Sequence, residues 1–105
     1  VSLSLQLENE PFVITDNVLL EIGNALARHY KAEATSIIES FLCSDDVTVV
    51  FLSPELFQRS FELYKSHQDK SWGMVDCISF TVMRDLNISR ALTSDRHFAQ
   101  AGFYP

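Results

Sequence analysis

The sequence has few cysteines, glycines and prolines, and it has no long apolar run. Cys43 and Cys77 stand far apart without a Cys-x-x-Cys spacing, which excludes a disulfide framework. Three glycines, three prolines and a hydrophobic content of 47% exclude collagen-like, mucin-like and disordered chains. No apolar stretch approaches the roughly 18 residues of a membrane span, and the first residues do not resemble a signal peptide. We therefore expect a soluble, cytoplasmic protein with two reduced, buried thiols and no membrane partner.

Several motifs of common enzyme classes are also missing. The chain has no Gly-x-Ser-x-Gly elbow, no Gly-x-Gly-x-x-Gly or P-loop sequence, and no His-Glu-x-x-His or clustered Cys and His. Serine hydrolases, nucleotide-binding folds and structural zinc domains lack their signatures here, so these classes are excluded.

Negative charge is concentrated in the first half of the chain. The net charge is -6, with nine acids and two bases in residues 1–58 but five acids and six bases in residues 59–105. A net-negative domain does not hold phosphate backbones by bulk electrostatics, because that affinity grows with the number of Lys and Arg contacts. If the substrate is a nucleic acid, metal ions or a partner must offset the acids.

The spacing of apolar residues predicts helices that alternate with short strands. Strands are predicted at residues 12–14, 47–52 and 91–93, and helices at residues 16–30, 32–43, 54–67 and 74–87. Such alternation is typical of an α/β fold with a mainly parallel sheet and helices on both faces. The length of 105 residues and the absence of linkers predict a single domain over residues 1–105.

Local signals support some of these boundaries and leave one segment open. Thr15 or Asp16 is expected to cap the first helix, and Ser53 the third, with Pro54 at its first position. Residues 1–7 alternate strictly between apolar and polar side chains, which favours a strand. The same leucines and valines are also spaced as helical pairs, so residues 1–10 are either a strand or the end of a helix.

Three acids fall where parallel-sheet proteins collect their ligands, beyond the carboxyl ends of the strands. Glu21 lies in the second turn of the helix after strand 12–14, and Asp95 lies two residues past strand 91–93. Asp76 lies in the first turn of its helix beside the apolar stripe, where a carboxylate needs a partner such as a cation. Taken singly, each acid is explained more readily by the helix dipole or by turn chemistry, but their coincidence at strand ends favours a common site. For His97, a surface or capping role is favoured over substrate contact.

Two longer stretches carry a family resemblance. Residues 69–80 read D-K-S-W-G-M-V-D-C-I-S-F, and residues 91–103 read A-L-T-S-D-R-H-F-A-Q-A-G-F. This sequence pattern closely resembles the C-terminal half of PIN domains, above all the VapC-type toxin ribonucleases and their relatives. Residues 12–22 are similar, more loosely, to the second strand and the glutamate-bearing helix of that family. The resemblance covers residues 12–105.

The resemblance implies a PIN-like three-layer α/β/α fold and the activity of a metal-dependent endoribonuclease. It also implies the role of a toxin in a toxin–antitoxin pair. By this resemblance Glu21, Asp76 and Asp95 are catalytic residues that bind Mg²⁺ or Mn²⁺. Thr93, Ser94 and Arg96 are expected to contact the RNA substrate or assist near the metal. An antitoxin protein and a second copy of the chain, in a homodimer, are the expected protein partners.

One part of the family pattern has no counterpart. PIN domains begin with a central strand that ends in a metal-binding aspartate, and nothing before Phe12 matches it. We therefore expect an N-terminally truncated PIN-like domain whose activity is reduced or lost. The segment 1–7 is expected to replace the missing strand or to pair with a second subunit, since unpaired strand edges invite association. The alternative function is a non-catalytic PIN-like module for protein interaction or oligomerisation.

Overall fold

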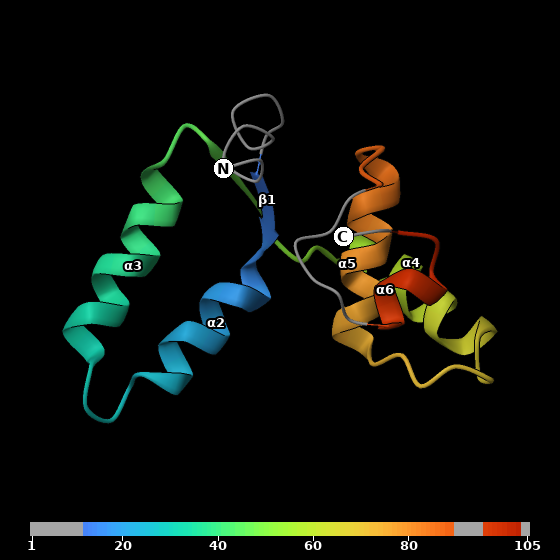
Figure 1. The fold of residues 1–105 in the computed structure, drawn as a ribbon, viewed down its shortest axis with the longest axis horizontal. Coiled ribbons are helices and arrows are strands. Elements are labelled where there is room, and N and C mark those ends of the chain that lie inside the picture. The colour runs from blue at the N-terminus through green and yellow to red at the C-terminus, as the bar shows by residue number, and fades with distance from the viewer. Residues whose placement is uncertain (1–11, 90–95, 104–105) are drawn as a thin grey trace. The chain divides into compact units, whose positions relative to one another are not determined.

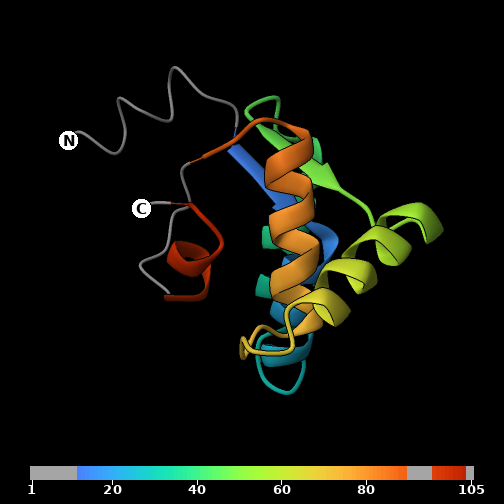
Figure 2. The same ribbon diagram turned by 90° about the vertical axis from the view of Figure 1, so that its right-hand side faces the viewer.

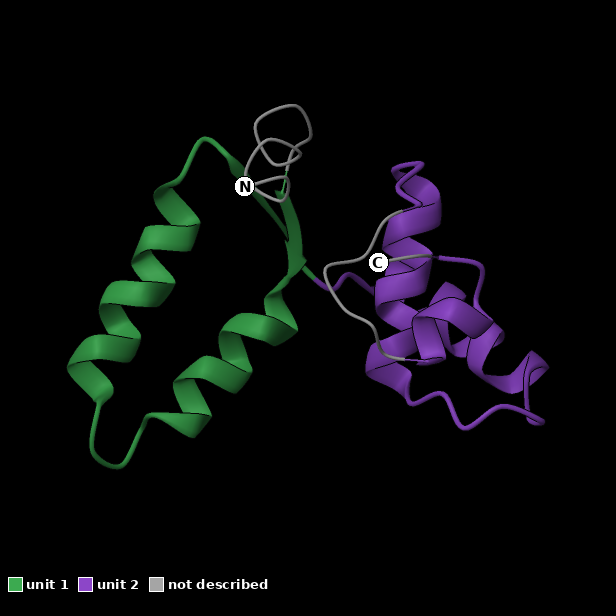
Figure 3. Cartoon of the chain, viewed as in Figure 1, with its two compact units in different colours: residues 1–51 green, residues 52–105 purple. Residues whose placement is uncertain are grey.

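A computed structural model describes residues 12–89 and 96–103, and the chain divides into two compact units, residues 1–51 and residues 52–105 (Figure 3). Each unit is described by itself. The first unit contains β1 (Phe12–Thr15), α2 (Asp16–Ala25), α3 (Lys31–Cys43) and β2 (Val47–Val50). The second unit contains α4 (Pro54–Ser66), α5 (Met74–Asp85) and α6 (Arg96–Gln100) (Figure 1).

The two described strands form a parallel pair in the first unit. Phe12 lies opposite Val47 and Thr15 opposite Val50, in unbroken register. Both strands are rich in β-branched residues, which favour the extended backbone. Parallel pairing requires a crossover connection, which α2 and α3 supply. The predicted strands at 12–14 and 47–52 and the α/β class with a parallel sheet are thus confirmed, although β2 ends at Val50.

Helix α2 is shorter than its apolar spacing predicts. It ends at Ala25 instead of residue 30, because the backbone tightens there: the amide of Ala27 donates to the carbonyl of Asn24, three residues back. The turn at residues 26–29 reverses the chain, so that α3 packs beside α2 (Figure 1). Thr15 takes the N-cap position of α2, but its side chain makes no capping hydrogen bond, which corrects that part of the prediction.

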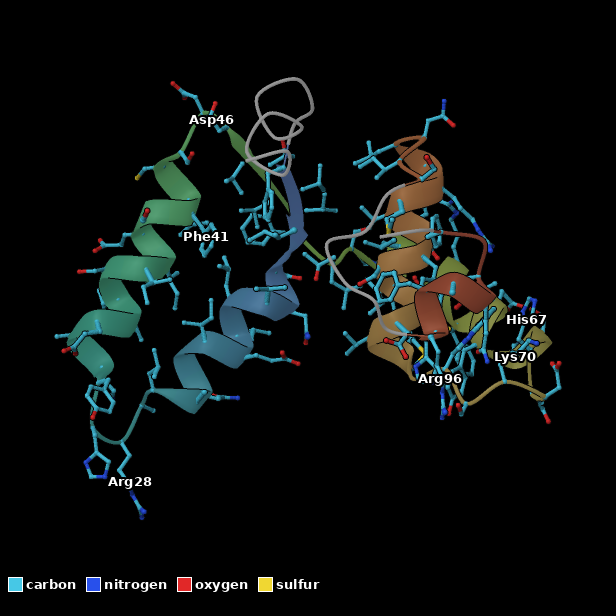
Figure 4. All side chains as sticks on the ribbon, viewed as in Figure 1. Arg28, Phe41, Asp46, His67, Lys70 and Arg96 are labelled. Carbon is cyan, nitrogen blue, oxygen red and sulfur yellow. The ribbon has the colours of Figure 1, made fainter. Side chains whose placement is uncertain are left out.

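Few side chains of the first unit are fully buried. Leu19 of α2 and Ala34 of α3 are buried, together with Thr15 at the end of β1. Phe41 of α3 is directed toward the strands (Figure 4) and is half-buried. The helices therefore cover the strand pair with a thin apolar layer.

Helices α4 and α5 form the frame of the second unit (Figure 2). Helix α4 begins as the sequence predicts: the amide of Leu56 donates to Ser53 Oγ at 3.1 Å, and Pro54 occupies the first turn. Ser60 of α4 is completely buried and donates to Thr81 Oγ1 of α5 at 3.3 Å. Small polar residues at this contact let the two helices approach closely while their hydroxyl groups stay paired.

An aromatic core fills the second unit between α5 and α6. Its buried members are Trp72, Cys77, Phe80 and Phe103. The ring of Phe80 lies 5.1 Å from that of Trp72 and 4.9 Å from that of Phe98, both edge-on, which is a favourable arrangement for aromatic pairs. The indole Nε1 of Trp72 donates to Gln100 Oε1 at 3.0 Å. The core thereby ties α6 and the loop before α5 to one face of α5.

Left-handed residues end both α5 and α6. Asn87, with φ of 59°, and Gly102, with φ of 96°, each allow the next amide to reach back to a carbonyl of the last turn. After α6, the amide of Phe103 donates to the carbonyl of Phe98 at 2.9 Å, and the two rings pack together. Glycine adopts this φ without the strain that a side chain would cause. The turn at Gly102 thus places Phe103 in the aromatic core.

Some predictions fall outside the described residues. The segment 1–10, with its choice between strand and helix end, and the strand at 91–93 both lie there. The single domain over residues 1–105 stays a prediction. Within residues 12–89 and 96–103, no helix has the length and apolar character that a bilayer crossing requires.

Candidate metal site

Asp76 is held in place at the start of α5. It is the third residue of the helix, and its Oδ2 accepts a hydrogen bond from the amide of Gly73 at 3.1 Å. The same oxygen lies 2.9 Å from Nδ1 of His97 in α6. Among the residues that the structure describes, Oδ1 accepts no hydrogen bond. The carboxylate is about one-quarter exposed, so it is fixed by the protein on one side and accessible on the other.

His97 links Asp76 to the loop before α5. Its Nε2 lies 3.0 Å from Oγ of Ser71, so the imidazole bridges a carboxylate and a hydroxyl group. A carboxylate can only accept, so the hydrogen on Nδ1 is assigned to the bond with Asp76. The ring is one-fifth exposed. His97 therefore contacts a predicted metal ligand, although the sequence favours a surface or capping role for it.

Cys77 follows Asp76 but belongs to the core. It is completely buried, and this burial, followed by the neighbouring carboxylate of Asp76, raises the pKa of its thiol above the usual value. A thiol that stays protonated is a poor nucleophile and a poor metal ligand. The predicted burial is thus confirmed for Cys77, whereas Cys43 at the end of α3 is exposed, which corrects the prediction for that residue.

Glu21 lies in a simpler setting on α2. Its Oε1 accepts a hydrogen bond from Asn17 Nδ2 at 3.1 Å, one helical turn earlier, and its side chain is exposed. Glu21 belongs to the first unit and Asp76 to the second. An exposed carboxylate restrained by a neighbouring amide can serve as an oxygen ligand for a hard cation.

The remaining predicted residues are the four from Thr93 to Arg96. Of these, Thr93, Ser94 and Asp95 fall outside the described residues. Arg96 is the first residue of α6 and is exposed (Figure 4). Within residues 12–89 and 96–103, no group of three acidic, histidine or cysteine side chains gathers to hold a metal ion. The donor chemistry of Glu21 and Asp76 fits Mg²⁺ or Mn²⁺, which prefer carboxylate oxygens.

Comparisons with known proteins identify the family. No family model matches the chain. The chain is 32% identical over 94 residues to the 23S rRNA-specific endonuclease VapC20 of Mycobacterium tuberculosis, in strains CDC 1551 / Oshkosh and ATCC 25618 / H37Rv, covering 89% of this chain and 72% of the relative. The chain belongs to the VapC group of the PIN-domain family. This confirms the family that the motifs at residues 69–80 and 91–103 indicate.

The fold agrees with the VapC assignment. A crystal structure of M. tuberculosis VapC20, described as a toxin that cleaves the sarcin-ricin loop, matches with a TM-score of 0.75 and 28% identity. The match covers 95% of this chain and 78% of that structure. The PIN-like α/β fold is therefore confirmed, and the alternative of a non-catalytic interaction module is not favoured. As a class, VapC nucleases depend on metal ions, act on RNA and pair with antitoxins.

Proposed function

We propose that this chain is a VapC-type toxin, a metal-dependent endoribonuclease in which Glu21, Asp76 and Asp95 bind Mg²⁺ or Mn²⁺. The observation that carries this proposal is the similarity to VapC20, an rRNA endonuclease, over most of the chain. The setting of Asp76 adds support, because its carboxylate is oriented through Oδ2 and its side chain stays about one-quarter exposed. Structured RNA with a loop of the sarcin-ricin type is the substrate class to test first.

The roles of the residues follow from their chemistry. When bound, a divalent ion of this kind activates water and neutralises charge on the scissile phosphate. Asp76 presents one carboxylate oxygen to the ion, and Glu21 and Asp95 supply further oxygen ligands. Arg96 is exposed, and its guanidinium group can pair with a phosphate of the RNA. Thr93 and Ser94 contribute hydroxyl groups beside Asp95. A divalent cation held by these carboxylates would offset part of the net charge of -6.

The proposal is tested by RNA cleavage with purified protein. A sarcin-ricin hairpin is incubated with the chain and Mn²⁺ or Mg²⁺ at millimolar concentration, with and without EDTA. We expect cleavage that EDTA abolishes and that Asp76→Asn lowers by at least about 100-fold, since even outer-shell changes cost 10–100-fold. Asp69→Asn is the matched control, because Asp69 is a highly exposed acid in the same unit. Cleavage that resists EDTA, or that Asp76→Asn leaves unchanged, would contradict the proposal.

The proposed protein partners are an antitoxin and a second copy of the chain, in the cytoplasm. Large apolar side chains on α4, including Phe57 and Tyr64, are more than 40% exposed, and such surfaces bind protein partners. Light scattering on the purified chain is expected to give the mass of a dimer. A strict monomer at all concentrations would rule out the homodimer.

A further inference from the structure

His97 and Ser71 form a hydrogen-bonded chain behind Asp76 that the proposed function does not yet use. The order is Ser71 Oγ, His97 Nε2, His97 Nδ1 and Asp76 Oδ2, with contacts of 3.0 Å and 2.9 Å at the two ends of the ring. The three residues come from a loop, from α6 and from α5. His97 lies 26 residues from Ser71 and 21 residues from Asp76 in the sequence, so this arrangement depends on the tertiary fold of the second unit.

We propose that His97 is a positioning residue for the metal-binding carboxylate of Asp76, and that Ser71 fixes the imidazole ring. This inference rests on the proposed function, since it concerns the same site. The hydrogen bond from Nδ1 restrains Oδ2, while the Asp76 side chain stays about one-quarter exposed. Metal-binding carboxylates need such support, and losing a residue of this kind typically costs 10–100-fold in metal affinity or activity.

The aromatic core makes His97 suited to this role. Its neighbour Phe98 packs edge-on against the buried Phe80, and Arg84 Nη2 of α5 donates to the carbonyl of Ala101 at 3.1 Å. These two contacts hold α6 and the residue after it against α5, on the C-terminal side of His97. Because the backbone of His97 is fixed by packing, its ring can hold the carboxylate at small cost in side-chain entropy. The same helix begins directly after Asp95, so one short segment serves two of the three acids.

Competing roles for the histidine give different outcomes. If His97 only stabilised α6, its loss would lower the melting temperature and leave the Mn²⁺ affinity of the folded protein unchanged. If Ser71 were a nucleophile activated by His97 and Asp76, Ser71→Ala would abolish cleavage. A positioning role predicts that Ser71→Ala has a smaller effect than His97→Ala, because the hydroxyl group acts only through the ring.

The test measures Mn²⁺ binding by electron paramagnetic resonance on the full chain, well below the melting temperature of each variant. We expect His97→Ala to raise the Kd by about 10–100-fold and Ser71→Ala by less than 10-fold. His97→Asn, whose amide can donate from the position of Nδ1, is expected to restore most of the affinity. His97→Gln, whose amide lies farther along the side chain, is expected to behave as His97→Ala does.

A double variant separates positioning from folding. In an Asp76→Asn background, His97→Ala is expected to change the Kd no further, since the carboxylate on which it acts is absent. Equal Kd values for the unmodified chain and His97→Ala would overturn this inference and leave the proposed function intact. Cleavage lost in Ser71→Ala but kept in His97→Ala would also overturn it. Failure of the unmodified chain to bind Mn²⁺ would overturn both proposals.

Discussion

The two units of the chain differ in how much they bury and in how firmly they hold their acids. The second unit packs Trp72, Phe80 and Phe103 into one aromatic core, and it fixes Asp76 with two hydrogen bonds. Among residues 12–51 of the first unit, the buried side chains are the smaller Leu19, Ala34 and Thr15, and Glu21 accepts its hydrogen bond from the neighbouring side chain of Asn17.

This difference indicates that the carboxylate of Asp76 is already oriented before a cation binds. A carboxylate restrained by both the backbone and an imidazole loses little freedom when it binds a cation, whereas an exposed glutamate must be ordered at that moment. We therefore expect Asp76 to lose less freedom than Glu21 when each binds a cation.

The cysteines provide the largest contrast. Cys43 of the first unit is exposed, whereas Cys77 of the second is completely buried and has a raised pKa. Iodoacetamide is expected to alkylate Cys43 in the native protein and Cys77 at least about 1,000-fold more slowly, since core exposure requires an opening of about 5 kcal/mol or more. Mass spectrometry of peptides after timed quenching measures both rates. Similar rates for the two thiols would refute a tightly packed second unit.

Removing Phe80 is expected to be the most damaging single truncation. Its ring is completely buried among three other aromatic rings, so Phe80→Ala should lower the free energy of unfolding by about 3–5 kcal/mol. Phe57→Ala is the matched control, since Phe57 is 46% exposed on α4. Urea denaturation followed by circular dichroism gives both values. If Leu19→Ala in the first unit costs more than Phe80→Ala, the contrast between the units is wrong.

The helix caps differ in the same direction. Ser53 accepts the amide of Leu56 at the start of α4, whereas Thr15 makes no capping bond at the start of α2. Ser53→Ala should therefore lower the free energy of unfolding by about 1 kcal/mol. Thr15→Val, which keeps the shape and removes the hydroxyl group, should change it by less than about 0.5 kcal/mol. A larger loss with Thr15→Val would reveal a cap at α2 after all.

The smallest effect concerns an exposed ion pair between α4 and α5. Arg59 contacts both carboxylate oxygens of Asp85, and this hydrogen bonding lowers the pKa of Asp85. A lowered pKa contributes stability above the ordinary value of about 4 that is lost as the pH falls through the lowered pKa. The melting temperature of the unmodified chain should exceed that of Asp85→Asn slightly at pH 7 and match it in strong acid. High salt should also remove the difference, because the pair is exposed.

Local signals in the sequence predict much of the fold. The β-branched runs give β1 and β2, and Ser53 with Pro54 gives the start of α4, because each depends on neighbouring residues alone. The end of α2 is wrong by five residues, since its apolar spacing continues past Ala25 while the turn to α3 requires the backbone to tighten. Apolar periodicity does not register such a turn.

The candidate site is less accessible to sequence reasoning. Asp76 is predicted beside the apolar stripe of its helix, and the structure places it there, partly buried. The role of His97 is missed, because its contact with Asp76 spans 21 residues and arises only when α6 packs on α5. The motif at residues 91–103 contains the histidine, but only the fold shows which of its neighbours it contacts. The metal-binding assignments of Glu21, Asp76 and Asp95 stay predictions, as do the substrate contacts of Thr93, Ser94 and Arg96.

The central claim is that Asp76 belongs to a metal site, and anomalous scattering from crystals soaked in Mn²⁺ tests it most directly. We predict a peak in the anomalous difference map within bonding distance of Asp76 Oδ1, with Asp95 and Glu21 as further ligands, and no such peak in Asp76→Asn. A map of the unmodified protein without a peak at Asp76, at Mn²⁺ concentrations that support RNA cleavage, would contradict the account.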